Sequence, residues 1–189
     1  MEEGTVSERE AQREFDDLLH SELWQLPRHA MGVSFPHGDL ASWRLRAEDE
    51  RALRYFGVPV FEPGGGRHGV QLVGDVQSSE HPVIDSAAGP VFRLGTYWGR
   101  SLGVLEGTGE VVAVPAESGR PVAYVNSGAR PFVETAWRWG LAIPVLRRMD
   151  DYEQLYDSLE RFHKLACALD PQVAEGGKFG WWPGIIGSW

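Results

Sequence analysis

Five short runs of β-branched and aromatic residues between Val58 and Val125 constrain the fold more than any other feature of this sequence. Glycine, serine, aspartate or proline separates each run from the next, which is typical of strands joined by tight turns. The runs are GVQLVGDV (69–76), PVFRLGTYW (90–98), SLGVLE (101–106), EVVAV (110–114) and PVAYV (121–125). They predict a twisted, largely antiparallel sheet of about five strands. Between the last two runs, Gly119 is free to adopt the positive φ that a hairpin loop requires.

Helical periodicity precedes the sheet region. The stretch 8–23 predicts a helix, because its apolar residues recur on one stripe that extends to Leu26. Ser7 and Glu10 have the spacing of a capping box and predict its start. A second helix is expected over 47–57, where Gly57 stands at the position of a C-terminal cap.

Helices are also predicted after the sheet region, so the expected fold class is α+β, with helices packed around the sheet. One helix should begin near Pro131, and Gly140 or Pro144 should end or kink it. Trp137 and Trp139 are two residues apart, which predicts one at the core and the other at its rim. A further helix is expected over 155–169, with aspartates before it and Asp-Pro after it.

The formal net charge of −9 bears on the choice of partners. It disfavours nucleic acid and anionic membrane and favours a basic partner, although net acidity also simply keeps a protein soluble. The single cysteine, Cys167, and the lack of an apolar run of membrane-spanning length predict a soluble, cytoplasmic protein. The acidic N-terminus does not resemble a signal peptide.

Catalytic and metal-binding motifs are not apparent in the sequence. The six histidines do not have the spacing of metal ligands, and Cys167 is expected to be a small buried side chain. Carboxylates such as Glu106, Glu110 and Glu134 are numerous, but the sequence does not establish an acid–base pair. We therefore expect no enzymatic activity, no metal and no cofactor.

The segment FRLGTYWGRSLGVLEGTGEVVAVPAESGRPVAYVNSGARPFVETA (92–136) resembles the central motif of the SUKH superfamily of bacterial immunity proteins, most closely its fourth family. ERALRYFGVPVF (50–61) and ALDPQVAEGGKFGWWPGII (168–186) resemble flanking elements of the same family. The matching residues are Phe92, Gly95, Gly103, Gly109, Val112, Gly119, Val125, Asn126, Ser127 and Phe132. The resemblance predicts a SUKH-like α+β domain over 50–189, with 1–49 as a helix and loop extension packed on it.

The resemblance implies a structural role for the turn between the last strand and the helix that follows. Asn126 and Ser127 should lie in this turn, and Phe132 should be buried against the sheet. Pro131 departs from the family pattern, and because proline has no N–H it belongs in the first helical turn. The helix cap is therefore expected within 128–130.

The resemblance also implies a function: binding and neutralising a cognate toxin, often a nuclease or a nucleic-acid deaminase. The expected partner is a basic toxin domain, met by an acidic face that carries an aromatic residue. The candidate partner-binding residues are Trp98, Glu106 and Glu110, because they flank short strands and loops. The alternative is a small-molecule-binding protein or an enzyme of secondary metabolism that uses an aromatic pocket.

Overall fold

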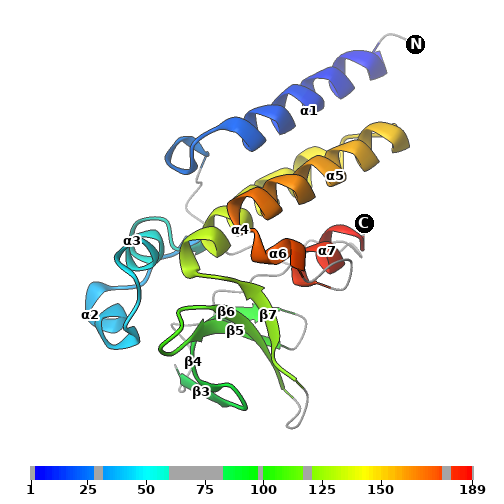
Figure 1. The fold of residues 1–189 in the computed structure, drawn as a ribbon. Helices are drawn as coiled ribbons and strands as arrows, with labels where there is room; N and C mark the ends of the chain where they lie inside the picture. The colour runs from blue at the N-terminus through cyan, green and yellow to red at the C-terminus, as the bar shows by residue number, and fades with distance from the viewer. Residues whose placement is uncertain are drawn as a thin grey trace.

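The computed structural model describes residues 3–27, 32–59, 83–97, 100–116, 121–175 and 180–188 (Figure 1). Within these residues the α-helices are α1 (Glu3–His20), α2 (His37–Leu40), α3 (Ala47–Tyr55), α4 (Ala129–Leu146), α5 (Tyr152–Leu169), α6 (Gln172–Glu175) and α7 (Trp181–Ile186), and the 3₁₀ helices are η1 (Leu23–Gln25) and η2 (Ala41–Trp43). The strands are β1 (Gly32–Val33), β2 (Val58–Pro59), β3 (Val83–Ser86), β4 (Gly89–Tyr97), β5 (Arg100–Leu105), β6 (Val111–Pro115) and β7 (Ala123–Asn126).

The main sheet is an antiparallel meander in the order β3-β4-β5-β6-β7, and β1 pairs with β2 in a separate ribbon. The predicted α+β class is therefore confirmed. Four predicted runs coincide with β4 to β7, whereas the run at 69–76 and Gly119 lie outside the described residues. The sequence analysis did not predict the edge strand β3, whose four residues are too few for a clear pattern.

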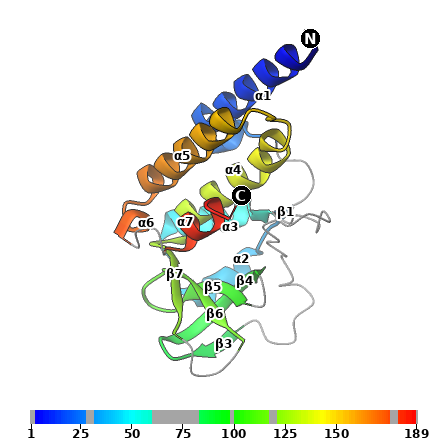
Figure 2. The ribbon, with the colours of Figure 1, turned by 90° about the vertical axis from the view of Figure 1, so that its right-hand side faces the viewer.

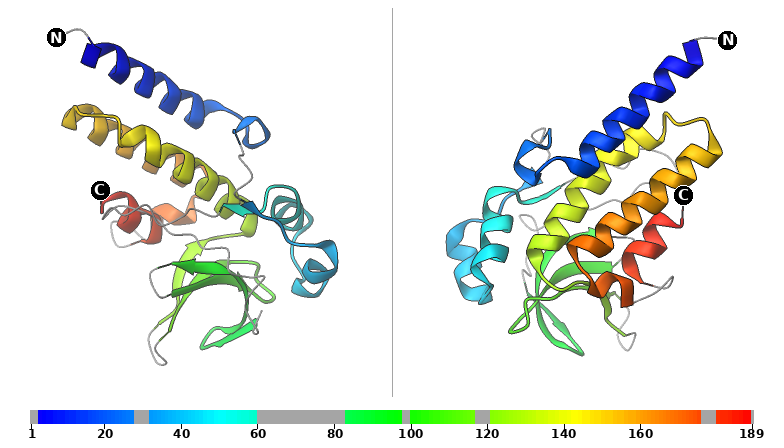
Figure 3. Two further views of the ribbon diagram at one scale, coloured as in Figure 1. Left: turned by 180° about the vertical axis from the view of Figure 1, so that it is seen from behind. Right: turned by 45° about the horizontal axis from the view of Figure 1, so that its top comes forward.

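Helices α1, α4, α5, α6 and α7 lie above the sheet, whereas α2 and α3 lie to one side of it (Figures 1 and 2). Helix α4 lies in the middle, with α1 and α5 beside it and with β2, β7 and α3 in contact on other sides (Figure 3). The main core is continuous from the sheet through α4 to the outer helices. A smaller apolar cluster lies on strands β4, β5 and β6, and its buried members are Val91, Leu105, Val112 and Val114.

The central position of α4 corrects the prediction for its two tryptophans. Trp137 and Trp139 are both buried, at 3% and 0% exposure, rather than one at the core and one at the rim. The Trp137 indole donates to the carbonyl of Gly57 at 3.1 Å, and the Trp139 ring lies 5.0 Å from the ring of Phe162. A helix enclosed on several sides buries residues all round, so spacing along the helix does not select one buried face.

The ends of the helices follow the predicted signals in part. Gly128 is the N-cap of α4, within the predicted range, and Gly57 has φ of +65° after α3, as a C-terminal glycine cap requires. Helix α4 continues through Gly140 and ends at Leu146, two residues after Pro144, because the burial of α4 on several sides outweighs the helix-breaking tendency of glycine and proline at those positions. The capping-box prediction was wrong: α1 begins at Glu3, so Ser7 lies inside the helix.

Arg138 of α4 connects the N-terminal helix to the rest of the fold. Its side chain is only 4% exposed, and the guanidinium donates to the carbonyl of Leu18 in the last turn of α1 and, at 2.7 Å, to that of Ser21 just after it. It also pairs with Glu134 at 2.8 Å. A cation placed there compensates the unpaired carbonyls and the negative end of the helix dipole. Helix α1 is thus attached to α4 by buried polar contacts as well as by apolar packing.

Candidate functional site

The N-terminus of α4 receives its capping carboxylate from a different helix. Its N-cap residue Gly128 has no side chain to offer, and the Asp49 carboxylate of α3 accepts a hydrogen bond from the Arg130 backbone N–H at 2.6 Å. A Cβ atom at Gly128 would lie 2.8 Å from Asp49 Oδ1, so glycine makes room for this contact. Asp49 therefore fixes the position of α4 relative to α3.

Asp170, the residue after α5, binds the same strand-to-helix turn from the other side. Its carboxylate accepts from the Ser127 backbone N–H at 2.7 Å, from Asn126 Nδ2 at 2.9 Å and from the Tyr124 hydroxyl at 3.2 Å. Asn126 is fully buried and accepts a bond from the Trp182 indole at 2.9 Å. Burial, followed by the nearby Asp170 carboxylate, raises the pKa of Tyr124 above its usual range. These contacts make the turn a rigid part of the molecule.

Glu106 and Glu110 lie at the two ends of one turn between β5 and β6. The turn is closed by bonds from the Leu105 N–H to the Glu110 carbonyl, at 2.8 Å, and from the Gly109 N–H to the Leu105 carbonyl, at 3.0 Å. A Cβ atom at Gly109 would lie 4.0 Å from Asp49 Oδ2, so the turn approaches α3. The structure therefore brings two predicted contact residues together, while the third, Trp98, lies outside the described residues.

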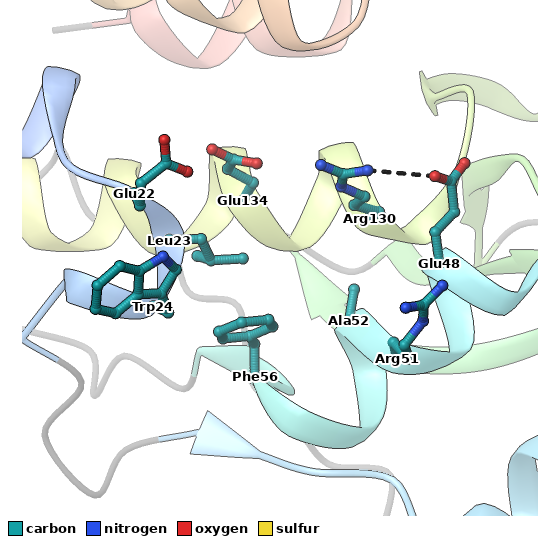
Figure 4. Close-up of a pocket in the computed structure, with 9 residues that line it drawn as sticks. All are labelled: Glu22, Leu23, Trp24, Glu48, Arg51, Ala52, Phe56, Arg130 and Glu134. Atoms are coloured by element: carbon teal, nitrogen blue, oxygen red, sulfur yellow. Dashed lines mark hydrogen bonds and ion pairs between the residues drawn. The ribbon is translucent and has the colours of Figure 1, made fainter.

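A groove of about 360 Å³ lies between η1, α3 and α4 (Figure 4). We call it the α3–α4 groove, and it is lined by Glu22, Leu23, Trp24, Glu48, Arg51, Ala52, Phe56, Arg130 and Glu134. Trp24 is 65% exposed, and Arg130 pairs with Glu48 at 3.2 Å. A second pocket of about 310 Å³ shares Glu48, Arg130 and Glu134 with this groove and also includes Asp49. The groove, the second pocket and the turn with Glu106 and Glu110 thus follow one another around the N-terminal ends of α3 and α4.

The chemistry of this region is that of binding through charge and apolar contact. The groove combines aromatic and aliphatic side chains with carboxylates at its edge, and such sites hold amphipathic groups. Burial raises the pKa of Asp49, while the hydrogen bond from the Arg130 N–H opposes this effect. Among the described residues there is no group of three or more histidine, cysteine, aspartate or glutamate side chains that could hold a metal ion. In the same part of the chain, every helix is too short or too polar to cross a membrane.

Replacing Asp49 by asparagine tests whether burial of its charge dominates. Asparagine keeps an acceptor for the Arg130 N–H, so the cap survives, but the buried charge is removed. Folding raises the pKa of the Asp49 carboxyl, so this group stabilises the folded wild-type protein at pH values below 3.8, its pKa in the unfolded chain. This contribution is lost as the pH rises through the folded pKa. Denaturant melts should therefore show Asp49→Asn gaining stability relative to wild type from about pH 4 to pH 7. If the stability of Asp49→Asn relative to wild type stays constant or falls as the pH rises, the hydrogen bonds to the carboxylate outweigh the cost of its burial.

Sequence reasoning did not predict the roles of three residues of this region: Trp24 in the groove, Asp49 at the start of α4, and Asp170 in the contacts to the strand-to-helix turn. In the sequence, Trp24 does not belong to the apolar stripe of Phe15, Leu18 and Leu23. This position is the one local signal that its side chain faces solvent. The two aspartates act on residues 81 and 43 positions away, at Arg130 and Ser127, and local patterns do not report such distant pairs.

The comparisons with known proteins place this chain in a family. The family model of SUKH-4 immunity proteins matches residues 6–188, which includes most of α1, both ends of the α3–α4 groove and the turn with Glu106 and Glu110. No curated protein and no solved structure matches the chain. The match includes residues 6–49, which the motif resemblance did not cover. Because it spans nearly the whole sequence, the chain belongs to the SUKH-4 immunity protein family.

Proposed function

We propose that this protein neutralises a cognate toxin domain by forming a stoichiometric complex with it. The observation that carries the proposal is the match to SUKH-4 immunity proteins over residues 6–188. The proposed toxin is of the nuclease or nucleic-acid deaminase type, and the proposal assigns no catalytic step, metal or cofactor to the immunity protein.

Charge supports this choice of partner. A toxin domain that acts on nucleic acid presents a basic surface to the phosphate backbone. A chain with net charge −9 attracts such a surface and speeds the encounter. Binding there would also keep nucleic acid away from the toxin, because both compete for the same positive surface.

The contact residues that we propose from the sequence are Trp98, Glu106 and Glu110. The two glutamates are partly exposed on their turn, and this turn approaches Asp49, the neighbour in sequence of Glu48 in the groove. An interface of standard size buries about 800 Å² on each partner, which is enough to cover adjacent features of this kind. The turn and the α3–α4 groove are therefore proposed as parts of one interface.

A small-molecule function is the second candidate, because Asp49 lines a pocket and has a raised pKa. Such a combination is also typical of ligand and active sites. However, one oxygen of Asp49 accepts the Arg130 N–H at 2.6 Å, and the carboxylate is 1% exposed. This arrangement supports a structural role, so we favour the protein partner.

The double variant Glu106→Gln/Glu110→Gln tests the role of the turn. Removing two charges while keeping side-chain size should slow association with the purified toxin domain several-fold at low salt and change dissociation much less. The effect should fade at 0.15 M salt and above, where exposed charges are screened beyond about 8 Å. Surface-immobilised binding kinetics measure both rates. The matched control is Glu153→Gln/Asp157→Asn on the exposed face of α5. If this control slows association as much as the double variant of the turn, the proposed role of the turn is contradicted.

A further inference from the structure

We infer that the α3–α4 groove receives a lysine or arginine side chain of the toxin, with Trp24 as the anchor of the contact. This inference rests on the proposed function and adds a position and a chemistry to it. It assigns a binding role to the first fifty residues, which supply Glu22, Leu23, Trp24 and Glu48 to the groove.

Trp24 differs from the buried tryptophans of the fold. Trp43, Trp137, Trp139 and Trp182 are 0–5% exposed, whereas Trp24 is 65% exposed. Its neighbour Leu23 is buried, so the short helix η1 is fixed to the core while the indole stays accessible. Reciprocal bonds, from the Gln25 N–H to the Glu22 carbonyl at 2.9 Å and from the Glu22 N–H to Gln25 Oε1 at 3.0 Å, hold η1 in place. A large ring presented on a rigid element is well suited to anchor an interface at low entropic cost.

The charges around the groove favour a cation as the occupant. Figure 4 shows the carboxylates of Glu22 and Glu134 at the end of the groove that carries Leu23 and Trp24. The two cations that line the groove, Arg51 and Arg130, lie at the other end: Arg130 is paired with Glu48 at 3.2 Å, and Arg51 Nε donates to the Ala47 carbonyl at 3.1 Å. Among the described residues, Glu22 has no ion-pair partner. The end of the groove near Trp24 therefore has an excess of negative charge.

Glu134 has a partner, but this partner is occupied elsewhere. Its ion pair is with Arg138, whose buried guanidinium also donates to carbonyls at the end of α1. The Glu134 side chain is 15% exposed, so it still borders the groove. A carboxylate in contact with one shared cation can accept a further charge-assisted hydrogen bond, because its two oxygens offer about four acceptor positions.

The shape of the groove fits an amphipathic side chain. Leu23, Ala52 and Phe56 line it, and a lysine or arginine packs its aliphatic stem on such surfaces while its charged end reaches polar groups. The exposed indole adds a cation–π contact, for which tryptophan is the best aromatic partner. A volume of about 360 Å³ is at the low end for ligand pockets, which run from about 300 to 1,000 Å³. The groove therefore has room for one or two side chains.

A second exposed aromatic surface provides a matched control. Tyr152 and Tyr156 on α5 are 77% and 62% exposed, and exposed carboxylates lie beside them at Glu153 and Asp157. Neither tyrosine lines the α3–α4 groove or the second pocket. This surface has comparable aromatic exposure and charge, so it separates a specific groove contact from general acidity.

The test measures binding of the purified toxin domain encoded beside the gene to Trp24→Ala, Trp24→Phe and Tyr152→Ala by calorimetry. Trp24→Ala should weaken binding at least about 20-fold, as expected for an anchor tryptophan. Trp24→Phe should retain part of the affinity, since a phenyl ring still contacts the stem and the cation. Tyr152→Ala should bind like wild type. Melting temperatures of both Trp24 variants should match wild type, since the side chain is largely exposed.

The outcomes separate the inference from the proposed function. Binding by wild type together with unchanged binding by Trp24→Ala overturns the groove contact and leaves the immunity function standing. A loss confined to Tyr152→Ala likewise overturns it and moves the interface to α5. Failure of wild type itself to bind the toxin contradicts the proposed function, and the groove inference with it.

Discussion

Replacing Phe132 by alanine is expected to lower the free energy of unfolding by about 3–5 kcal/mol. Phe132 is fully buried near the start of α4 and belongs to the same apolar core as residues of the sheet, such as Phe92 and Leu102. The deletion removes a large apolar side chain and leaves a cavity in this core. Urea denaturation followed by circular dichroism measures the loss.

The control for this experiment is Tyr156→Ala, at a position on α5 that is 62% exposed. Substitutions of this kind usually change stability by less than about 0.5 kcal/mol. A denaturation midpoint for Phe132→Ala that equals that of wild type would refute the role of Phe132 as the link between α4 and the sheet.

Replacing Arg138 by methionine is expected to cost about 3–5 kcal/mol and to release α1 from the body. The change keeps an unbranched apolar stem but removes the guanidinium, which leaves the carbonyls of Leu18 and Ser21 without their donor. It also leaves the largely buried Glu134 carboxylate without its cation. Amide hydrogen exchange should accelerate throughout α1 more than in the strands β5 and β6, because local contacts of α1 are lost first.

Lys164→Met gives the matched comparison. Lys164 forms an ion pair of the same i, i+4 type with Glu160 at 2.7 Å, but on an exposed helix surface. Exposed pairs of this kind contribute little, so its melting temperature should stay near that of wild type. Equal protection of α1 in wild type and Arg138→Met would show that apolar packing alone holds the N-terminal helix.

The strands and long helices could be predicted because their patterns are local. The runs that became β4 to β7 are bounded by turn residues, and the 155–169 stripe follows one face of α5, whose Phe162 and Ala166 are fully buried. The start of α1 and the length of α4 could not be predicted equally well. Capping signals and single glycine or proline residues are poor predictors of where a helix begins or ends when packing against neighbouring elements contributes most of the helix stability.

The candidate site was less accessible to sequence reasoning. The position of Glu106 and Glu110 beside short strands predicts them as contact residues, and both are partly exposed on the turn between β5 and β6. The α3–α4 groove is formed by three segments that are far apart in the chain, at 22–24, 48–56 and 130–134. No periodicity relates these segments, so only their packing reveals that Trp24 and Glu22 stand near the Glu134 carboxylate of α4.

Co-expression with the toxin domain encoded beside the gene tests the central claim most directly. Cells that produce the toxin alone should stop growing, and the immunity protein should restore growth and co-purify with the toxin in a one-to-one complex. Trp24→Ala should give weaker rescue than Tyr152→Ala at equal expression. Absence of both rescue and co-purification with the wild-type chain would contradict the proposal that this protein acts by binding a toxin.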